Sequence, residues 1–496
     1  MMSTDEQHPH NDHKSIVIVG GGIAGVTCAS TLAGLCCDYK IHLISSSPVI
    51  KSVGNFKQRG VHLSEFDVVE KDLHQLSQEF PSICVSNCSI VGLDTERKIL
   101  HTDKSEQIVY DRLCICSGAH PKLIPHSCPE YVLGIRDTSS VTDFQSKLSD
   151  SKRILIVGNG GIATELVYSI EFCEIVWVIK DDSISSTFLD EGAAKFFTKK
   201  LSTNREPRAN VSKRLRYSVD VDEKTSHIPG SALGPDWDES LDLKGCSNVR
   251  KNVQIEFMTE VVEIHRAKDL SRNKYPHIKG ENITETNDLI WPIYVELSNN
   301  AIYGCDFVVS ATGVIPNVEP FLTGNSFKTS SEGGICVDEE MRTTEQDVYA
   351  AGDVCTADWN WADYWFQMRL WTQARQMGFY AAQCIHLHMT KGESPLLYAP
   401  FEIFTHATSF YGMKVILLGL FNGQKLINNH KILFRIQEDV EYVKVIIQDS
   451  KLKGALLIGE TDLEECFENL IINQLNVSNI EDELLNPSID IEDYFD

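Results

Sequence analysis

A chain of 496 residues is too long for a single hydrophobic core, and its length predicts about three domains. Its formal net charge of −25 argues against a nucleic-acid groove as the main function, because binding to phosphates needs clustered cations. The polar N-terminus lacks an apolar secretory segment. The sequence contains no run of about eighteen apolar residues, so we expect no membrane span. We therefore expect the 15 cysteines to be reduced thiols in a cytoplasmic and nuclear protein that binds neither nucleic acid nor membrane directly.

Two segments repeat one pattern, in which an apolar run meets a glycine turn and the start of a helix. They read SIVIVGGGIAGVTCA (residues 15–29) and RILIVGNGGIATELV (residues 153–167). The motif positions are Gly20, Gly22 and Gly25 in the first segment and Gly158, Gly160 and Ala163 in the second. The first position permits a tight turn, the second lets a pyrophosphate approach the backbone, and the third lets helix and strand pack closely. The repeat predicts an α/β chain with two Rossmann-like domains that hold two dinucleotides and transfer electrons between them.

Three further segments follow in an order that resembles a known family. YDRLCICSGAHPKL (residues 110–123) and DFVVSATGVIPNVEPF (306–321) resemble its two ATG-type turns, and TTEQDVYAAGDV (343–354) resembles its flavin-binding motif. Together with the glycine loops, they are similar to the pyridine nucleotide-disulphide oxidoreductases, which are two-domain flavoproteins. The resemblance implies FAD in the first unit and NAD(P)H in the second. It also implies that Asp353 binds the flavin ribityl chain, and that Ser117, Gly118, Gly313 and Gly352 shape the nucleotide sites.

The family pattern and the changes in composition divide the chain into five parts. From about residue 201 to 252 the periodicity fades into a polar segment, which we expect to be a flexible insertion. The predicted parts are an FAD-binding domain at 14–150 and 301–393, an NAD(P)-binding domain at 151–300, a C-terminal α+β domain at 394–480 and an acidic tail at 481–496.

The chain lacks the cysteine pair that gives the family its name. There is no C-x-x-C motif, and residues 45–66 contain no cysteine. Cys114 and Cys116 share one face of a strand, where buried thiols are favoured over a disulfide. We therefore expect NAD(P)H to be oxidised by hydride transfer to the flavin, without a dithiol relay. The resemblance places Glu165 at the flavin–nicotinamide junction, with Lys57, or less readily Lys51, as the cation beside it.

Two positions depart from the usual pattern of ribose-binding acids. Ser45 stands about 20 residues beyond Gly25, where an acid is common, and its neutral hydroxyl predicts loose FAD retention. Lys180 stands at the matching place in the second unit. A cation there slightly favours the 2′-phosphate of NADPH, but Asp181 and Asp182 follow it and leave NADH open.

The electron acceptor is not specified by these motifs, and oxygen, a quinone, a small molecule or a separate redox protein all stay open. Similarity to one branch of the family, in segments such as MRLWTQARQMG (residues 368–378), implies a role in oxidative-stress defence and in protecting the tRNA ligase complex. An alternative is a binding protein gated by NAD(P)H and FAD, whose reduced charge-transfer state controls the docking of a partner.

Overall fold

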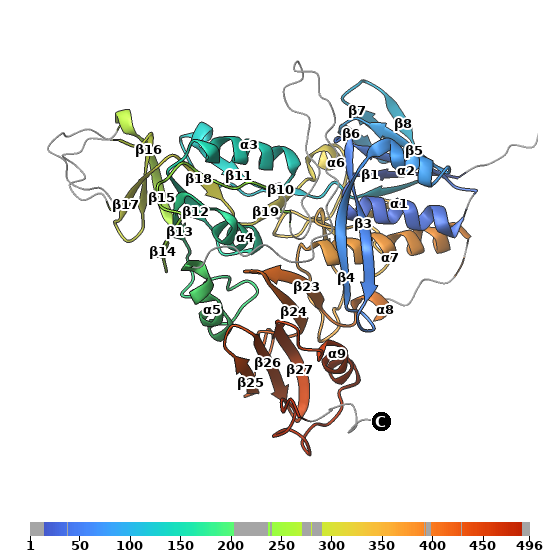
Figure 1. Cartoon of the computed structure of the whole chain (residues 1–496). Helices are drawn as coiled ribbons and strands as arrows, with labels where there is room; N and C mark the ends of the chain where they lie inside the picture. The colour runs from blue at the N-terminus through green and yellow to red at the C-terminus, as the bar shows by residue number, and fades with distance from the viewer. Residues whose placement is uncertain are drawn as a thin grey trace, which may run out of the picture.

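The computed structural model describes residues 14–36, 38–202, 237–238, 241–269, 279, 290–390, 392, 398–427 and 429–488. Most of the expected insertion and the last residues of the acidic tail therefore lie outside the described residues. Figure 1 shows two mixed α/β units side by side, with a third unit, formed by the C-terminal part of the chain, below them. Within the described residues, no helix is both long enough and apolar enough to cross a membrane.

The first unit is built on a parallel sheet of five strands with β1 at its centre. Ile16, Val17 and Ile18 of β1 are completely buried, as expected for a continuous apolar run in a parallel sheet. The two long helices of this unit pack side by side (Figure 1), and a Cβ on Gly378 would lie 2.2 Å from the carbonyl of Ala24. In sheet order, the strands are β21 (Val348–Ala350), β9 (Arg112–Ile115), β1 (Ser15–Val19), β2 (Lys40–Ser45) and β5 (Ile83–Asn87), and the long helices are α1 (Ile23–Leu35) and α7 (Trp371–Thr390).

Smaller elements complete the first unit and connect it to the second. They are the hairpin β3 (Val49–Gln58) and β4 (Ser64–Asp72), α2 (Leu73–Glu79), the antiparallel strands β6 (Ile90–Asp94), β7 (Ile99–Thr102) and β8 (Gln107–Val109), α6 (Glu319–Leu322), and the pair β20 (Ile335–Val337) and β22 (Cys355–Ala357). The two connections between the units cross as an antiparallel pair, β10 (Ala119–Pro121) and β19 (Val314–Pro316).

The second unit repeats the arrangement with a second parallel sheet. Its strands, in sheet order, are β11 (Val132–Gly134), β18 (Phe307–Ser310), β12 (Arg153–Val157), β13 (Cys173–Val178) and β14 (Lys251–Glu256). Its helices are α3 (Thr138–Ser149), α4 (Gly161–Ser169) and α5 (Glu191–Thr198), and its second, antiparallel sheet comprises β15 (Val261–Arg266), β16 (Ile293–Leu297) and β17 (Ile302–Cys305). Short 3₁₀ turns lie at Pro129–Tyr131, Lys199–Ser202 and Ala267–Asp269.

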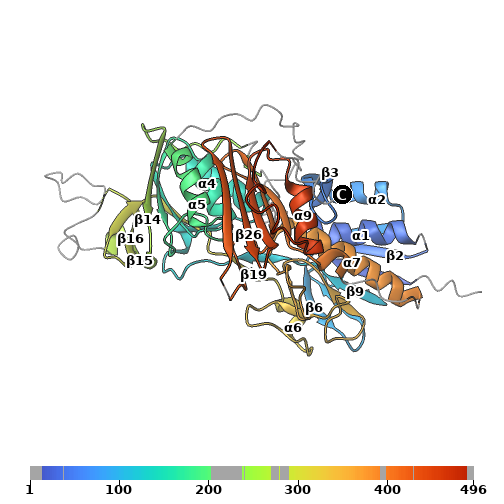
Figure 2. The ribbon, with the colours of Figure 1, turned by 90° about the horizontal axis from the view of Figure 1, so that it is seen from below.

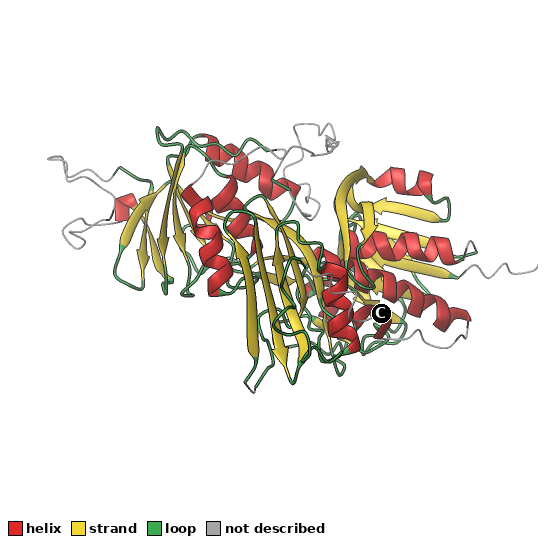
Figure 3. Cartoon of the chain, turned by 60° about the horizontal axis from the view of Figure 1, so that its bottom comes forward, coloured by secondary structure: helices red, strands yellow, loops and turns green. Residues whose placement is uncertain are grey.

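The C-terminal unit is an antiparallel sheet covered on both faces. One face packs on the second unit through Tyr442 and Phe197, and the other packs on α9 through Leu457 and Phe467. Figure 2 shows the sheet between α4 and α5 on one side and α9 on the other, and Figure 3 shows that this unit is mainly sheet. The elements are α8 (Tyr398–Phe401), β23 (Thr405–Phe410), β24 (Met413–Gly419), β27 (Lys451–Ile458), β26 (Glu441–Gln448), β25 (Lys431–Gln437) and α9 (Glu464–Asn473).

The α/β class with two Rossmann-like units and a C-terminal α+β unit is confirmed, but strand pairing moves three of the predicted boundaries. β11 and β18 both belong to the second sheet, so the second unit begins before residue 151 and continues beyond residue 300. Leu484 is completely buried against the α9 side of the C-terminal sheet, so the packed unit continues into the predicted tail. The sequence does not predict these boundaries, because short strands show too little periodicity of their own and are recognised only from the strands with which they pair.

Candidate dinucleotide-binding site

The first glycine loop brings β1, β9 and α1 into close contact. Gly20 has φ of +127°, and a Cβ there would lie 2.0 Å from the carbonyl oxygen of Cys116. A Cβ on Gly25 would lie 2.0 Å from the carbonyl oxygen of Gly20. Gly22, in contrast, has no atom within 4 Å of its Cβ position, and it caps α1 without a side-chain hydrogen bond. The loop therefore leaves backbone N–H groups and open space at a helix N-terminus, which fits a pyrophosphate.

A cleft of about 390 Å³ opens at this loop. It brings together six of the residues expected from the sequence: Gly20, Gly22, Ser45, Ser117, Gly118 and Asp353. It also includes three polar residues that the sequence interpretation missed: Arg136, His120 and Asn317. The cleft combines a helix N-terminus, a cation and a carboxylate, which suits the phosphates and the polyol chain of FAD.

Arg136 and Asp353 form the charged end of this cleft. The Arg136 Nη2 donates to Asp353 Oδ2 at 3.3 Å, and both side chains are about one-fifth exposed. Arg369 donates from Nε to the Asp353 carbonyl at 3.1 Å and pairs with Glu332 at 2.8 Å. Gly118 has φ of +68°, and a Cβ there would lie 2.9 Å from Arg136 Nη2. The guanidinium is therefore held between a glycine turn and the predicted ribityl-binding aspartate.

Asn317 joins the two ATG-type turns. Its amide donates to the Ser117 carbonyl at 2.9 Å, and its own carbonyl accepts from the Ser117 hydroxyl at 2.8 Å. The His120 ring nitrogen lies 2.7 Å from the Asn317 Oδ1. Gly313 has φ of +106° with open space around it, and Gly352, at φ of +81°, lies against Ala24 of α1. These bonds fix the crossing of β10 and β19 beside the cleft.

Ser45 lies in the cleft, but its hydroxyl is already used by the protein. It donates to the Ser47 carbonyl at 2.8 Å and accepts from the Ser47 backbone N–H at 3.2 Å. Ser46 and Ser47 also contribute to the cleft, and Ser46 is exposed. A ribose hydroxyl would therefore compete with an existing turn at Ser45, while Ser46 offers a hydroxyl towards solvent.

The two candidate lysines have different surroundings. Lys51 of β3 is 4% exposed, its Nζ lies 2.6 Å from Glu70 Oε1, and its backbone N–H donates to Gly21 at 2.9 Å. Lys57 is exposed and forms no ion pair within the part of the chain that the structure describes. The register of the hairpin shifts between Gly54 and Lys57, which turns the outer end of β3 towards solvent. The buried cation beside the glycine loop is thus Lys51, while Lys57 is exposed, and which of the two lies beside the flavin stays a prediction.

Glu165 does not pair with Lys57. It is half-buried on α4, where its Oε2 accepts a hydrogen bond from Trp237 Nε1 at 2.6 Å. Trp237 is buried in the core of the second unit. The carboxylate is thus oriented by an indole N–H, and this contact links α4 to a residue within the predicted insertion.

The second glycine loop repeats the geometry of the first. Gly158 has φ of +127°, with its Cβ position 2.1 Å from the carbonyl oxygen of Ala311. Gly160 caps α4, has open space at its Cβ position and receives no side-chain cap, while Ala163 is fully buried. The two loops thus share a closed first position and an open second position, as expected for two dinucleotide sites.

The chain beyond β13 is held against the second loop by Asn159. Its amide nitrogen donates to Asp181 Oδ2 at 2.8 Å, and its Oδ1 accepts from the Ser185 N–H at 2.5 Å. Ser186 also donates to Asp181 Oδ2 at 2.8 Å. Lys180 is exposed at the end of the strand. Asp181 is therefore engaged with the loop, while Lys180 and Asp182 are both exposed, so the choice between NADPH and NADH stays open.

Cys88 and Cys116 line the cleft, Cys114 stands two residues before Cys116, and all three are buried. The Sγ atoms of Cys114 and Cys116 are 3.6 Å apart, and both residues are free cysteines. The hydrogen bond with Cys114 and burial raise the pKa of the Cys116 thiol well above its usual range. Since the thiolate is the reactive form, these thiols are poorly suited to exchange with a disulfide.

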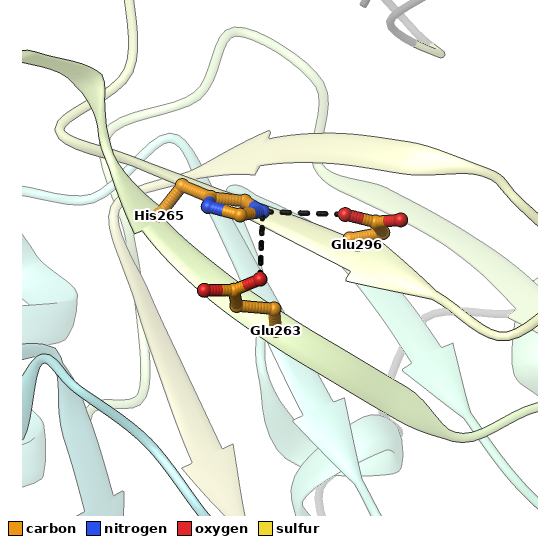
Figure 4. A group of neighbouring side chains, drawn as sticks. All are labelled: Glu263, His265 and Glu296. Carbon is orange, nitrogen blue, oxygen red and sulfur yellow. Dashed lines mark hydrogen bonds and ion pairs between the residues drawn. The ribbon is translucent and has the colours of Figure 1, made fainter. Parts of the chain in front are cut away.

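A separate cluster of charged side chains lies on the small sheet β15–β17 (Figure 4). His265 Nε2 lies 3.3 Å from Glu296 Oε2 and 3.9 Å from Glu263 Oε2. Glu263 and Glu296 are directly opposite in the strand register, where two like charges destabilise a sheet unless a cation lies between them. An imidazole and two carboxylates can also bind a divalent cation, but an ion pair of the histidine with both acids accounts for this cluster.

Comparison with known proteins agrees with this geometry. The chain matches the family described as pyridine nucleotide-disulphide oxidoreductase over residues 14–229 and 231–378. The Homo sapiens pyridine nucleotide-disulfide oxidoreductase domain-containing protein 1 is 49% identical over 489 residues, which are 97% of each chain.

Solved structures with low sequence identity share the fold. A ferredoxin reductase from Rhodopseudomonas palustris has a TM-score of 0.67 at 16% identity and covers 97% of this chain and 100% of its own. The water-forming NADH oxidase from Lactobacillus brevis has a TM-score of 0.63 at 15% identity, with 96% and 95% covered. The family and the two glycine loops identify FAD and NAD(P)H as the cofactors of an oxidoreductase. The chain belongs to the pyridine nucleotide-disulphide oxidoreductase family.

Proposed function

We propose that this protein oxidises NAD(P)H by hydride transfer to FAD without a redox-active cysteine pair, and that the electrons pass to an acceptor outside the chain. The observation that carries the proposal is the pair of glycine loops, each closed at its first position and open at its second. FAD supplies the hydride-accepting chemistry when it is bound. The protein binds and orients the two cofactors and places charged groups beside them.

Named residues supply those contributions. The N–H groups at Gly22 and the Arg136 guanidinium would hold the FAD phosphates, and Asp353 would accept hydrogen bonds from the polyol chain. Lys51 pairs with Glu70, and its backbone N–H donates to Gly21 of the glycine loop, so Lys51 is the cation that we expect beside the flavin. In the second unit, Gly160 and Lys180 would serve the NAD(P)H phosphates.

We exclude a dithiol relay because the thiols at the cleft and next to it are buried. Cys114 is completely buried and Cys116 is 4% exposed, and both thiols have a raised pKa. A disulfide substrate would need an accessible thiolate at this place. Direct reduction of disulfides is therefore not the expected activity, although the family name suggests it.

The fold and the sequence similarity also suggest candidate electron acceptors and a biological role. The proteins of the same fold include a ferredoxin reductase and a water-forming NADH oxidase, so a redox protein and oxygen are both candidate acceptors. The similarity at 49% identity supports transfer of the expectations made from the sequence. These are oxidative-stress defence, protection of the tRNA ligase complex, and a cytoplasmic and nuclear location.

Anaerobic reduction followed by exposure to air tests the proposal. The FAD-loaded protein is reduced with NADH or NADPH while the flavin absorbance is recorded, and air is then admitted. Bleaching by NAD(P)H followed by turnover in air, or on adding an artificial quinone, is the expected result. A reduced state that persists in both acceptors would instead support a binding protein gated by NAD(P)H. Failure of NAD(P)H to bleach the flavin would refute both.

A further inference from the structure

Two residues of the predicted insertion pack on α4 of the second unit. Trp237 donates from Nε1 to Glu165 Oε2 at 2.6 Å, and the Ser169 hydroxyl donates to Asp238 Oδ2. Glu165 and Ser169 are four positions apart, so they lie one above the other on one face of the helix. Trp237 and Asp238 are each 7% exposed, so this face of α4 is covered at two successive turns.

The indole contacts the end of α4 that lies next to the second glycine loop. Gly160 caps the helix, and Glu165 stands on its second turn. Side chains of a helix tilt towards its N-terminus, which directs the Glu165 carboxylate back to the loop. At the far end, the Leu243 carbonyl accepts from the backbone N–H of Glu171, beyond α4. The segment from Trp237 to Leu243 therefore runs antiparallel to the helix, with the indole at the end near the loop.

The same segment also contacts α3. The Asp242 carbonyl accepts a hydrogen bond from Gln145 Nε2 at 3.1 Å. α3 begins at Thr138, two residues after Arg136 of the FAD cleft. Glu165 therefore lies on the side of α4 that faces α3, and the N-terminus of α3 borders the first dinucleotide site.

The adenosine half of NAD(P)H is expected on another side of the loop. In a Rossmann unit, its ribose lies at the carboxyl end of the second strand, which here is β13. Thr164 faces that side, since its hydroxyl lies 2.7 Å from the hydroxyl of Ser185, beyond β13. The nicotinamide half has to leave the loop towards FAD, because the hydride passes between the two cofactors. We therefore expect it on the side of α4 that carries Glu165.

We propose that Trp237 is a positioning residue for hydride transfer, because its indole N–H fixes the Glu165 carboxylate beside the nicotinamide half of NAD(P)H. This inference rests on the proposed function and adds to it a residue outside both glycine loops. When the hydride leaves with its two electrons, FAD becomes an anion and the nicotinamide a cation. A carboxylate that is already oriented stabilises this cation without reorganisation. An indole N–H fills only one of about four acceptor positions of a carboxylate, so Trp237 orients Glu165 without neutralising it.

Another tryptophan of the second unit provides the matched control. Trp291 is half-buried before β16, and its ring lies 4.7 Å from the guanidinium carbon of Arg153. Its Nε1 is buried without a hydrogen-bond partner among the described residues. Trp291→Phe and Trp237→Phe therefore make the same change in the same unit, but only Trp237→Phe removes a bond to a carboxylate.

Calorimetric titration of the FAD-loaded protein tests the proposal without electron transfer. Trp237→Phe is expected to bind the oxidised dinucleotide, NAD+ or NADP+, roughly 10 times more weakly, because a hydrogen bond to a charged group is lost. Its affinity for the adenine fragment, ADP or the 2′-phosphate of ADP, should not change. Trp291→Phe should bind both ligands as the wild type does. Trp237→Met, whose flexible side chain adapts to gaps in a core, is the second variant in case Trp237→Phe does not fold.

Anaerobic stopped-flow reduction of the flavin supplies the second measurement. The rate constant at saturating NAD(P)H is expected to fall roughly tenfold in Trp237→Phe. Glu165→Gln keeps the shape of the side chain but removes its charge, and should cause a similar loss. Adding Trp237→Phe to Glu165→Gln should change the rate constant by less than about twofold, because both residues act through one contact.

Three results would overturn the role of Trp237. Equal weakening of the whole dinucleotide and of its adenine fragment would mean that Trp237 only supports the loop. Unchanged binding and reduction in Trp237→Phe would remove the residue from the reaction, and a full additional loss in the double variant would show that it does not act through Glu165. A wild-type flavin that NAD(P)H does not reduce would instead refute the proposed function, while the titration would still report on Trp237.

Discussion

Gly22 and Gly160 are the two motif positions at which a side chain would enter nucleotide-binding space rather than protein. We expect Gly22→Trp to abolish FAD retention, because an indole would fill the space above the N-terminus of α1. Gly160→Trp should retain FAD but lose reduction by NAD(P)H, because the same change then blocks the second loop. The ratio of flavin to protein absorbance and anaerobic bleaching measure the two effects.

Each of these variants is the control for the other, since both place the same side chain at the cap of an equivalent helix. Full flavin occupancy in Gly22→Trp would refute the position of the pyrophosphate. Loss of flavin from both variants would indicate unfolding, which the thermal midpoint would reveal.

Arg136 offers a second prediction at this scale. Arg136→Met removes a charged donor from the cleft while keeping the length of the side chain, and leaves the Asp353 carboxylate without this partner. Hydrogen bonds to charged groups contribute about 1.5–3 kcal/mol, so FAD should bind roughly 10 to 100 times more weakly. Titration of the apoprotein by flavin fluorescence quenching measures the dissociation constant, and an unchanged value would remove Arg136 from the site.

The sequence could predict the glycines but not this arginine. A glycine is required where a Cβ would collide with the backbone, as at Gly20, so the local motif alone indicates its role. Arg136 approaches Asp353 across more than two hundred positions of sequence, and only the folded chain brings them together. Arg136 belongs to none of the motifs that the sequence presents.

At the scale of elements, the hairpin β3–β4 places two lysines in different surroundings, so their substitution should change the free energy of unfolding by different amounts. Lys51 and Glu70 form a buried ion pair, so Lys51→Met leaves an uncompensated carboxylate. Breaking such a pair costs about 3–5 kcal/mol, and the free energy of unfolding should fall by a similar amount. Lys57→Met changes the same residue type at the exposed end of the same strand and should stay within about 0.5 kcal/mol. Urea unfolding followed by tryptophan fluorescence measures both.

Equal effects of the two substitutions would contradict this account of the hairpin. The sequence could not predict which of the two lysines of this segment is buried. The choice depends on the register shift after Gly54 and on Asn55, which has φ of +47°. Such an irregularity depends on the partner strand and has no periodic signal in the chain.

At the scale of the whole molecule, His406 lies where all three units meet. It begins the C-terminal sheet on β23, its Nδ1 lies 3.0 Å from Thr372 Oγ1 of α7, and its ring is stacked 6.2 Å from Phe188 of the second unit. The centroid of the Trp371 ring lies 4.9 Å from that of His406. The ring is 1% exposed, and burial lowers the pKa of His406 to about 3.

This buried ring should make the stability of the assembled units depend on pH. The unfolded chain binds a proton at His406 below about pH 6.5, whereas the folded chain does not until about pH 3. Its contribution is therefore complete above pH 6.5 and falls by roughly 1.4 kcal/mol for each pH unit below it, down to the folded pKa. Between about pH 7.5 and 5.5, wild-type protein should lose roughly 1.4 kcal/mol more stability than His406→Gln, which keeps a polar group for Thr372 and does not titrate. Urea unfolding of both proteins at the two pH values measures the difference, and parallel losses would show that folding does not lower the pKa of His406.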